Sequence, residues 1–171
     1  MPPCLNQDNP ERITDPGRFG SLEERLDALL LEQLPALADA ARDRGVILLI
    51  EPVNREETEY LTSVDHAARL VAKANHPALG CTADFFHMQI EGHGMAEEIE
   101  RSAAFIRHVH VASITRVEPG PGPLDFNPGF RALKAAGYAG WLEVECRKLS
   151  GPPDEVLPKS ADYLRQTWRT A

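Results

Sequence analysis

The sequence predicts an α/β fold in which helices cover a parallel β-sheet, and three observations lead to this prediction. Short apolar segments alternate along the chain with helical segments of about ten to fifteen residues, which is the order of repeated strand–helix units. The segments at 46–50 and 79–83 are almost continuously apolar, as expected for strands buried on both faces. The 171 residues are 43% hydrophobic, which is enough for one sizeable core.

The chain starts with an expected irregular N-terminal tail at residues 1–20. These residues hold four of the fourteen prolines and have no periodic apolar pattern. Residues 21–171 are expected to form the folded domain. Ser21 and Glu24 form the S-x-x-E pattern of a capping box, which predicts the first helix.

The first helix is expected to be interrupted. Pro35 should break or kink it, because proline cannot donate a backbone hydrogen bond, and a second piece then runs to Arg44. Gly45 is suited to end that piece, because glycine adopts the left-handed conformation at little cost. The first strand, 46–50, follows.

The later elements repeat this alternation. Asn127 is expected to cap the third of the later helices, with Pro128 as its first residue and Gly137 at its end. In chain order we expect a helix at 63–74, a strand at 79–83, a helix at 95–106, a strand at 108–112, the helix that starts at Pro128, a strand at 141–145 and a final helix at 154–168.

Composition excludes several classes of protein. The formal charge of −8 argues against a nucleic-acid-binding face and against binding to an anionic membrane. No apolar run approaches the roughly 20 residues of a spanning helix, and the first ten residues lack the features of a signal peptide, so we expect a cytoplasmic protein. Its cysteines, Cys4, Cys81 and Cys146, are odd in number and unrelated in spacing, which predicts no disulfide framework.

Polar residues stand at the ends of all four predicted strands. Glu51 and Asp84 close the first two strands, His110 lies near the end of the third, and Glu145 ends the fourth. The carboxyl ends of parallel strands lie on one side of the sheet, so these four side chains are expected to converge. A single carboxylate at a strand end is usually a solvated group or a helix cap, but four in register are much harder to explain in that way.

A cation would stabilise such a group. Three carboxylates held together repel one another and lose water, and one divalent ion removes both costs. Oxygen ligands with one imidazole suit Mn²⁺ or Mg²⁺, with Co²⁺ as a further candidate. His108 and Glu143 lie two residues before His110 and Glu145 on the same face of each strand, so either can replace its neighbour as a ligand. We choose the later residue of each pair because it lies nearer the carboxyl end.

The remaining polar residues have less specific interpretations. His66, His76 and His93 are expected to occupy ordinary helix or loop positions. Asn54 and Arg55 fit an ordinary loop as well as they fit a functional site.

Four motifs resemble those of the sugar isomerase/epimerase family of xylose isomerase-like TIM barrels, of the ketose 3-epimerase and hydroxypyruvate isomerase type. The resemblance covers about residues 22–165, with the motifs in the family's order and spacing. They are EPVNREETEYLT (51–62), DFFHMQIEG (84–92), HVHVASITRVEPGPGPLDF (108–126) and GYAGWLEVE (137–145). The resemblance implies that the chain is the C-terminal half, about four βα units, of a barrel that typically needs about 250 residues.

The resemblance also implies roles for individual residues. One divalent metal ion, with Mn²⁺ the first choice, is expected on Glu51, Asp84, His110 and Glu145. The two glutamates are also expected to be catalytic, as an acid/base pair. Glu57, His87 and Arg116 match positions that bind the substrate. The sequence departs from the family at Ser113, where many members have an acidic residue soon after the ligand histidine.

The implied function is a divalent-metal-dependent isomerase or epimerase of a small sugar or hydroxy-carbonyl compound, acting by proton transfer through a metal-stabilised ene-diolate. Two alternatives remain. One is a non-catalytic or truncated barrel fragment. The other is a zinc nuclease like the AP endonucleases, which would need a basic rim that the charge of −8 does not predict. The expected partners are a carbohydrate and either a second copy of the chain or a missing N-terminal half.

Overall fold

The computed structural model describes residues 15–171, so residues 1–14 of the expected tail lie outside the described residues. Four strands pair in parallel as one sheet in the order β1-β2-β3-β4. They are β1 (Leu48–Ile50), β2 (Leu79–Asp84), β3 (Ile106–Val111) and β4 (Leu142–Val144). The predicted α/β fold with a parallel sheet is confirmed.

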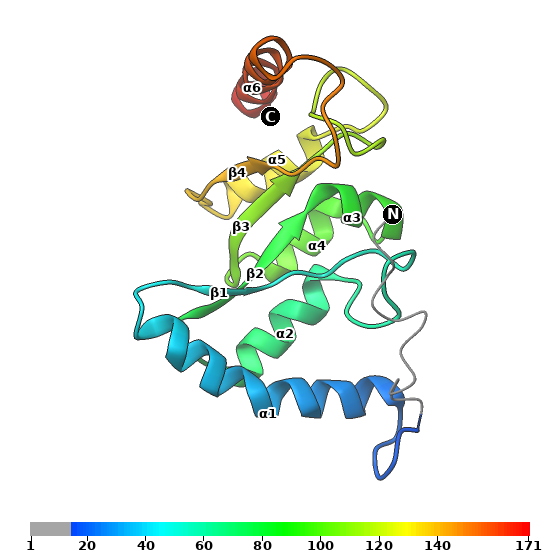
Figure 1. The fold of residues 1–171 in the computed structure, drawn as a ribbon, viewed down its shortest axis with the longest axis vertical. Coiled ribbons are helices and arrows are strands. Elements are labelled where there is room, and N and C mark those ends of the chain that lie inside the picture. The colour runs from blue at the N-terminus through cyan, green and yellow to red at the C-terminus, as the bar shows by residue number, and fades with distance from the viewer. Residues whose placement is uncertain (1–14) are drawn as a thin grey trace.

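Six helices accompany these strands in the described part of the chain, and α1 and α6 lie at opposite ends of the molecule (Figure 1). None of the six is both long and apolar enough to cross a membrane. They are α1 (Leu22–Arg42), α2 (Val64–Ala74), α3 (Phe85–Glu91), α4 (Met95–Ser102), α5 (Asn127–Ala135) and α6 (Pro153–Thr170).

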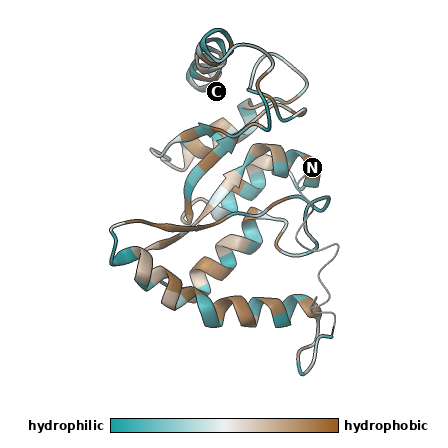
Figure 2. Ribbon diagram, viewed as in Figure 1, coloured by the Kyte–Doolittle hydropathy of each residue, from teal (hydrophilic) through white to brown (hydrophobic). Residues whose placement is uncertain are grey.

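The core lies between the sheet and its helices. All six residues of β2 are buried, and in Figure 2 the β1 segment is hydrophobic while polar residues recur along α1 and α6. Phe85, Phe126 and Phe130 are fully buried, with ring centroids 5.7–6.1 Å apart. Because Phe85 follows β2 directly, this aromatic cluster fixes the place where the second strand ends.

The two faces of the sheet differ in polarity. Val109 and Val111 of β3 are completely buried against the core, whereas His108 and His110 alternate with them and point to the opposite face. Glu143 of β4 is the register partner of His110 and shares that polar face. His110 and its alternatives His108 and Glu143 therefore lie on the side of the sheet that faces away from the helices.

Several details differ from the sequence prediction. Helix α4 ends at Ser102 and β3 begins at Ile106, inside the helix expected at 95–106, and β1 begins at Leu48 rather than at residue 46. Pro35 does not interrupt α1, because it lies on the exposed side of the helix between the buried residues Leu34 and Ala38, which hold both turns against the core. Asn127 is the first residue of α5 rather than its cap, since the cap position is Phe126. Helix α3 was not predicted.

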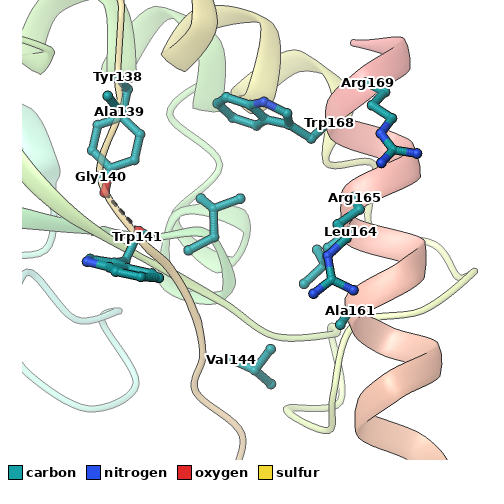
Figure 3. Close-up of a pocket in the computed structure, with 11 residues that line it drawn as sticks. Tyr138, Ala139, Gly140, Trp141, Val144, Ala161, Leu164, Arg165, Trp168 and Arg169 are labelled. Atoms are coloured by element: carbon teal, nitrogen blue, oxygen red, sulfur yellow. Dashed lines mark hydrogen bonds between the residues drawn. The ribbon is translucent and has the colours of Figure 1, made fainter.

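Both edges of the sheet are open within the described residues. At the β1 edge, Val46 and Ile47 are 56% and 50% exposed. At the β4 edge, Trp141 is 81% exposed beside an apolar groove of about 540 Å³ between β4 and α6 (Figure 3). The aromatic and aliphatic residues that line this groove include Tyr138, Leu142, Val144, Leu164 and Trp168.

Candidate active site

The four polar residues predicted at the strand ends lie together. Glu51, Asp84, His110 and Glu145 each offer one ligand atom, and these atoms all lie within 4.8 Å of one another. Glu51 follows β1 and Glu145 follows β4, which are the two edge strands. Edge strands of a flat four-stranded sheet would be about 14 Å apart, so the sheet must curve toward this side to bring the two glutamates together.

Only one of the two carboxylate oxygens of Asp84 is hydrogen-bonded within the described residues. One carboxylate oxygen, Oδ1, accepts the backbone N–H of Phe86 at 2.8 Å and caps α3. The other, Oδ2, is buried without a hydrogen-bond partner among the described residues, and His87 Nε2 lies 3.5 Å from it. Because a buried carboxylate oxygen is costly unless it is paired, a cation beside Oδ2 fits this geometry.

His110 connects the carboxylates of the cluster. Its Nδ1 donates to Glu51 Oε1 at 2.8 Å and lies 3.9 Å from Glu145 Oε2. The hydrogen bond to Glu51 raises the pKa of His110 against the opposing effect of burial. The three carboxylates and one imidazole form an oxygen-rich donor set of the kind that holds Mn²⁺ or Mg²⁺.

Arg116 links this cluster to Glu57. Its guanidinium donates to Glu57 Oε1 at 2.8 Å and to Glu145 Oε2 at 3.0 Å, and it lies 4.7 Å from the centre of the Phe86 ring. Its backbone has φ of 56°, a left-handed conformation that is uncommon for a side chain of this size. The backbone is held there because the Arg116 carbonyl accepts the N–H of Arg147 at 2.8 Å.

His87 is oriented by a residue that sequence reasoning left undecided. Asn54 is 1% exposed, and both its backbone N–H, at 3.1 Å, and its side-chain amide, at 2.7 Å, donate to His87 Nδ1. Burial and the charge of Arg116 lower the pKa of His87, which favours the neutral ring. Because Nδ1 accepts the Asn54 backbone N–H, the proton of the neutral ring lies on Nε2. This nitrogen faces Arg116 Nη2 at 3.3 Å and Asp84 Oδ2.

The loop after β1 is fixed by a second contact that the sequence did not predict. Arg55 donates to both oxygens of Glu91 through its guanidinium, at 3.0 and 2.9 Å, and its backbone N–H donates at 2.7 Å. Glu91 is buried and ends α3. This pairing holds the loop that carries Asn54 and Glu57 against α3.

Charge and burial set the protonation of the cluster. Burial raises the pKa of Asp84 to about 6, and the nearby charges of Glu51 and Glu145 act in the same direction. Burial also opposes ionisation of Glu145, but the hydrogen bond from Arg116 and the charge of His110 outweigh it and lower the pKa of Glu145. A cation would therefore compete with protons at Asp84 and His110.

The alternative ligands form a neighbouring group. His108 Nε2 donates to Glu143 Oε2 at 2.8 Å, and these two residues with His110 form a second set with ligand atoms within 4.8 Å. His66 is instead buried and bonded to Asp27 at 2.7 Å. Neither set of described residues includes His66, His76 or His93.

Comparison with known proteins decides the family. The family model described as "Xylose isomerase-like TIM barrel" matches residues 12–167. The chain belongs to this family. The matched curated proteins include epimerases and isomerases, among them 3-dehydro-D-guloside 4-epimerase of Escherichia coli (strain K12), 28% identical over 137 residues that cover 80% of this chain and 52% of that protein.

Solved structures agree on the fold. D-allulose 3-epimerase from Methylomonas sp. in complex with D-allulose has a TM-score of 0.78 at 26% identity, covering 86% of this chain and 57% of that one. An AP endonuclease, family 2, from Brucella melitensis has a TM-score of 0.72 at 26% identity, covering 84% and 57%. The chain thus spans little more than half the length of these family members, and the predicted partial TIM barrel is confirmed.

The raised pKa of Asp84 predicts that this residue destabilises the chelator-treated protein at neutral pH. An Asp84 pKa of about 6, above its ordinary value of 3.8, means that the folded state binds the proton more tightly than the unfolded state. Ionised Asp84 therefore lowers the free energy of unfolding above pH 6, and this destabilisation disappears as the pH falls toward 4. We expect Asp84→Asn, which keeps an oxygen to cap α3, to raise the free energy of unfolding by about 1–3 kcal/mol at pH 7.

Urea unfolding in EDTA at pH 7 and pH 4.5 measures this difference. The gain from Asp84→Asn should shrink at the lower pH, because the parent carboxyl group is then protonated as well. A variant less stable than the parent at pH 7, or a gain independent of pH, would contradict the assignment.

Proposed function

We propose that this protein is a divalent-metal-dependent isomerase or epimerase of a small sugar or hydroxy-carbonyl compound. The observation that carries the proposal is the convergence of Glu51, Asp84, His110 and Glu145 beside an orphaned buried oxygen of Asp84. The names of the curated relatives, which include ketose 3-epimerase and 2-oxo-tetronate isomerase, support the same class of reaction. We further propose that the protein is cytoplasmic.

In this proposal the metal is held by Glu51, Asp84, His110 and Glu145, with Mn²⁺ as the first choice and Mg²⁺ or Co²⁺ as alternatives. When bound, the ion supplies positive charge to the carbonyl and hydroxyl oxygens of the substrate. The chain's own carboxylates then do the proton transfer. Removing a proton beside a carbonyl needs one base, and epimerisation needs a second group to return a proton on the opposite face.

Glu51 and Glu145 are the proposed acid/base pair. They come from opposite edges of the sheet, so a small substrate can lie between them. Glu145 is kept ionised by its hydrogen bond from Arg116 at 3.0 Å, and in the metal-free chain Glu51 is oriented by its hydrogen bond from His110 at 2.8 Å. Each carboxylate is thus held in a defined direction before a substrate arrives.

Glu57, His87 and Arg116 are the proposed substrate-binding residues. Arg116 lies between the other two, since its guanidinium donates to Glu57 Oε1 at 2.8 Å and its Nη2 lies 3.3 Å from His87 Nε2. Arg116 offers several N–H donors for substrate oxygens, whereas its pKa prevents it from exchanging protons at neutral pH. We assign it to binding and orientation rather than to proton transfer.

The nuclease alternative is less well supported. The similar Brucella structure is that of an AP endonuclease, but the cluster here offers four carboxylates, counting Glu57, against the single guanidinium of Arg116. The formal charge of the chain is −8. A phosphate backbone would be repelled by this surface.

Metal binding is the first test of the proposal. We expect the purified protein to bind about one Mn²⁺ per site, because the four ligands surround one centre. Glu51→Gln, Asp84→Asn, His110→Ala and Glu145→Gln should each weaken binding roughly tenfold or more, since each removes a ligand. Calorimetric titration measures the affinity, and unchanged affinity in all four variants would reject the site.

Proton exchange is the second test. With Mn²⁺ present, the protein should incorporate solvent deuterium next to the carbonyl of a ketose or a hydroxypyruvate-like substrate, as followed by NMR. Glu51→Gln or Glu145→Gln should lower the rate about 10²-fold, the usual effect of losing an acid/base group. Arg116→Ala should act mainly on KM.

Glu100→Gln on the exposed side of α4 is the matched control and should leave the exchange rate unchanged. Exchange that survives in the Glu51/Glu145 double variant would refute the mechanism. A folded, metal-loaded protein that exchanges no substrate would favour the non-catalytic fragment.

We also propose that further βα units complete the sheet, from a longer chain or from a second polypeptide. The chain spans 52–57% of the length of the guloside epimerase and the two solved structures described above, and both sheet edges in the described residues are open, parallel strands. Open edges and apolar grooves favour association with another chain. The groove beside Trp141 is the surface where we expect the added units to pack.

The isolated 171-residue chain is therefore expected to self-associate at micromolar concentration, because Trp141 and the groove are exposed. Trp141→Lys should weaken association about tenfold by placing a charge at that edge. Leu37→Lys is the control, since Leu37 is 52% exposed but lies on α1. Sedimentation that shows a compact monomer with cooperative unfolding would contradict this proposal.

A further inference from the structure

The two ring nitrogens of His110 face different groups. Nδ1 lies 2.8 Å from Glu51 Oε1, inside the candidate metal cluster, while Nε2 points to Glu143 with Oε2 at 4.0 Å. A neutral imidazole has one N–H and one lone pair. If Nδ1 presents its lone pair to a cation, the proton must lie on Nε2, where it needs an acceptor.

The Glu143 carboxylate lies where it can accept this proton. It is the register partner of His110 on the neighbouring strand, so the two side chains project from the same face at adjacent positions. His108 Nε2 donates to Glu143 Oε2 at 2.8 Å and holds the carboxylate beside the His110 ring. The Glu143 side chain is 61% exposed, so it can shift by the roughly 1 Å that separates 4.0 Å from a hydrogen bond without disturbing the core.

We propose that Glu143 is a positioning residue for His110. Held by His108, its carboxylate accepts the Nε2–H of His110 and so directs the Nδ1 lone pair toward Glu51, Asp84 and Glu145. The inference rests on the metal site of the proposed function. Many family members have an acidic residue soon after the ligand histidine, where this sequence has Ser113. In this proposal Glu143, held by His108, takes the place of that acidic residue. Carboxylates that hold a ligand histidine in this way typically change metal affinity 10- to 100-fold.

Mn²⁺ titration of the 171-residue chain tests this role. Glu143→Gln keeps the shape of the side chain but removes its charge, and we expect Mn²⁺ to bind about tenfold more weakly with unchanged stoichiometry. Glu155→Gln, which removes the same charge from an exposed position on α6, should change affinity less than twofold. Urea unfolding in EDTA should be the same for Glu143→Gln and the parent, because the side chain is largely exposed.

A double-mutant cycle separates an effect through His110 from general electrostatics. In a His110→Ala background, Glu143→Gln should cost no further affinity, because the group that it orients is gone. His108→Ala should weaken binding in the parent but add little to Glu143→Gln. A loss of equal size with and without His110 would overturn the proposal.

Other outcomes are equally decisive. Affinity unchanged by Glu143→Gln, with normal binding in the parent, would reject this role and leave the metal site intact. Two ions per chain in the parent and one in Glu143→Gln would overturn it, because His108, His110 and Glu143 would then form a second metal site. A parent that binds no Mn²⁺ would reject the proposed function itself.

Discussion

The gathering of like charges at one end of a curved sheet is the constraint on which the rest of the site depends. Glu51, Asp84 and Glu145 come from three separate strands, yet their oxygens lie within 4.8 Å of one another. Their mutual repulsion is offset within the described chain by Arg116 and His110, each of which holds one carboxylate through a hydrogen bond. One buried oxygen of Asp84 has no hydrogen-bond partner among the described residues, so this compensation is incomplete.

The surrounding structure keeps these charges from moving apart. The three buried phenylalanines fix the end of β2 and so the position of Asp84. The pair Arg55–Glu91 fixes the loop after β1, while the left-handed backbone of Arg116 directs its guanidinium back toward Glu145. Proteins commonly retain such local strain where function needs it, with stability supplied by the rest of the fold.

The sequence predicted the features that follow from regular repetition. Strand ends recur at each βα unit, so the positions of Glu51, Asp84 and Glu145 could be read without a structure. Helix α3 could not, because Phe85 follows Asp84 without any intervening turn residues and its apolar residues continue the strand. The cap of α5 was misplaced by one residue, since Asp125 accepts the N–H of Asn127 and draws that residue into the first turn.

Contacts between distant segments were the least predictable part of the site. Asn54 is a plausible loop residue until the fold buries it against His87, 33 positions later in the chain. The pairing of Glu143 with both His108 and His110 likewise depends on the register of β3 and β4, which no local pattern specifies.

The exposure of Trp141 gives the molecule an intrinsic optical reporter. The chain has two tryptophans, and the other, Trp168, is partly buried and packs edge-on against the fully buried Phe130 with ring centroids 5.3 Å apart. An indole in water emits at longer wavelength than one in an apolar environment, so the two residues should contribute separable fluorescence. Acrylamide quenching should act chiefly on Trp141. A polypeptide that covers the β4 edge should shift the emission and quenching of Trp141 more than those of Trp168, because Trp168 lines the same groove but is already partly buried.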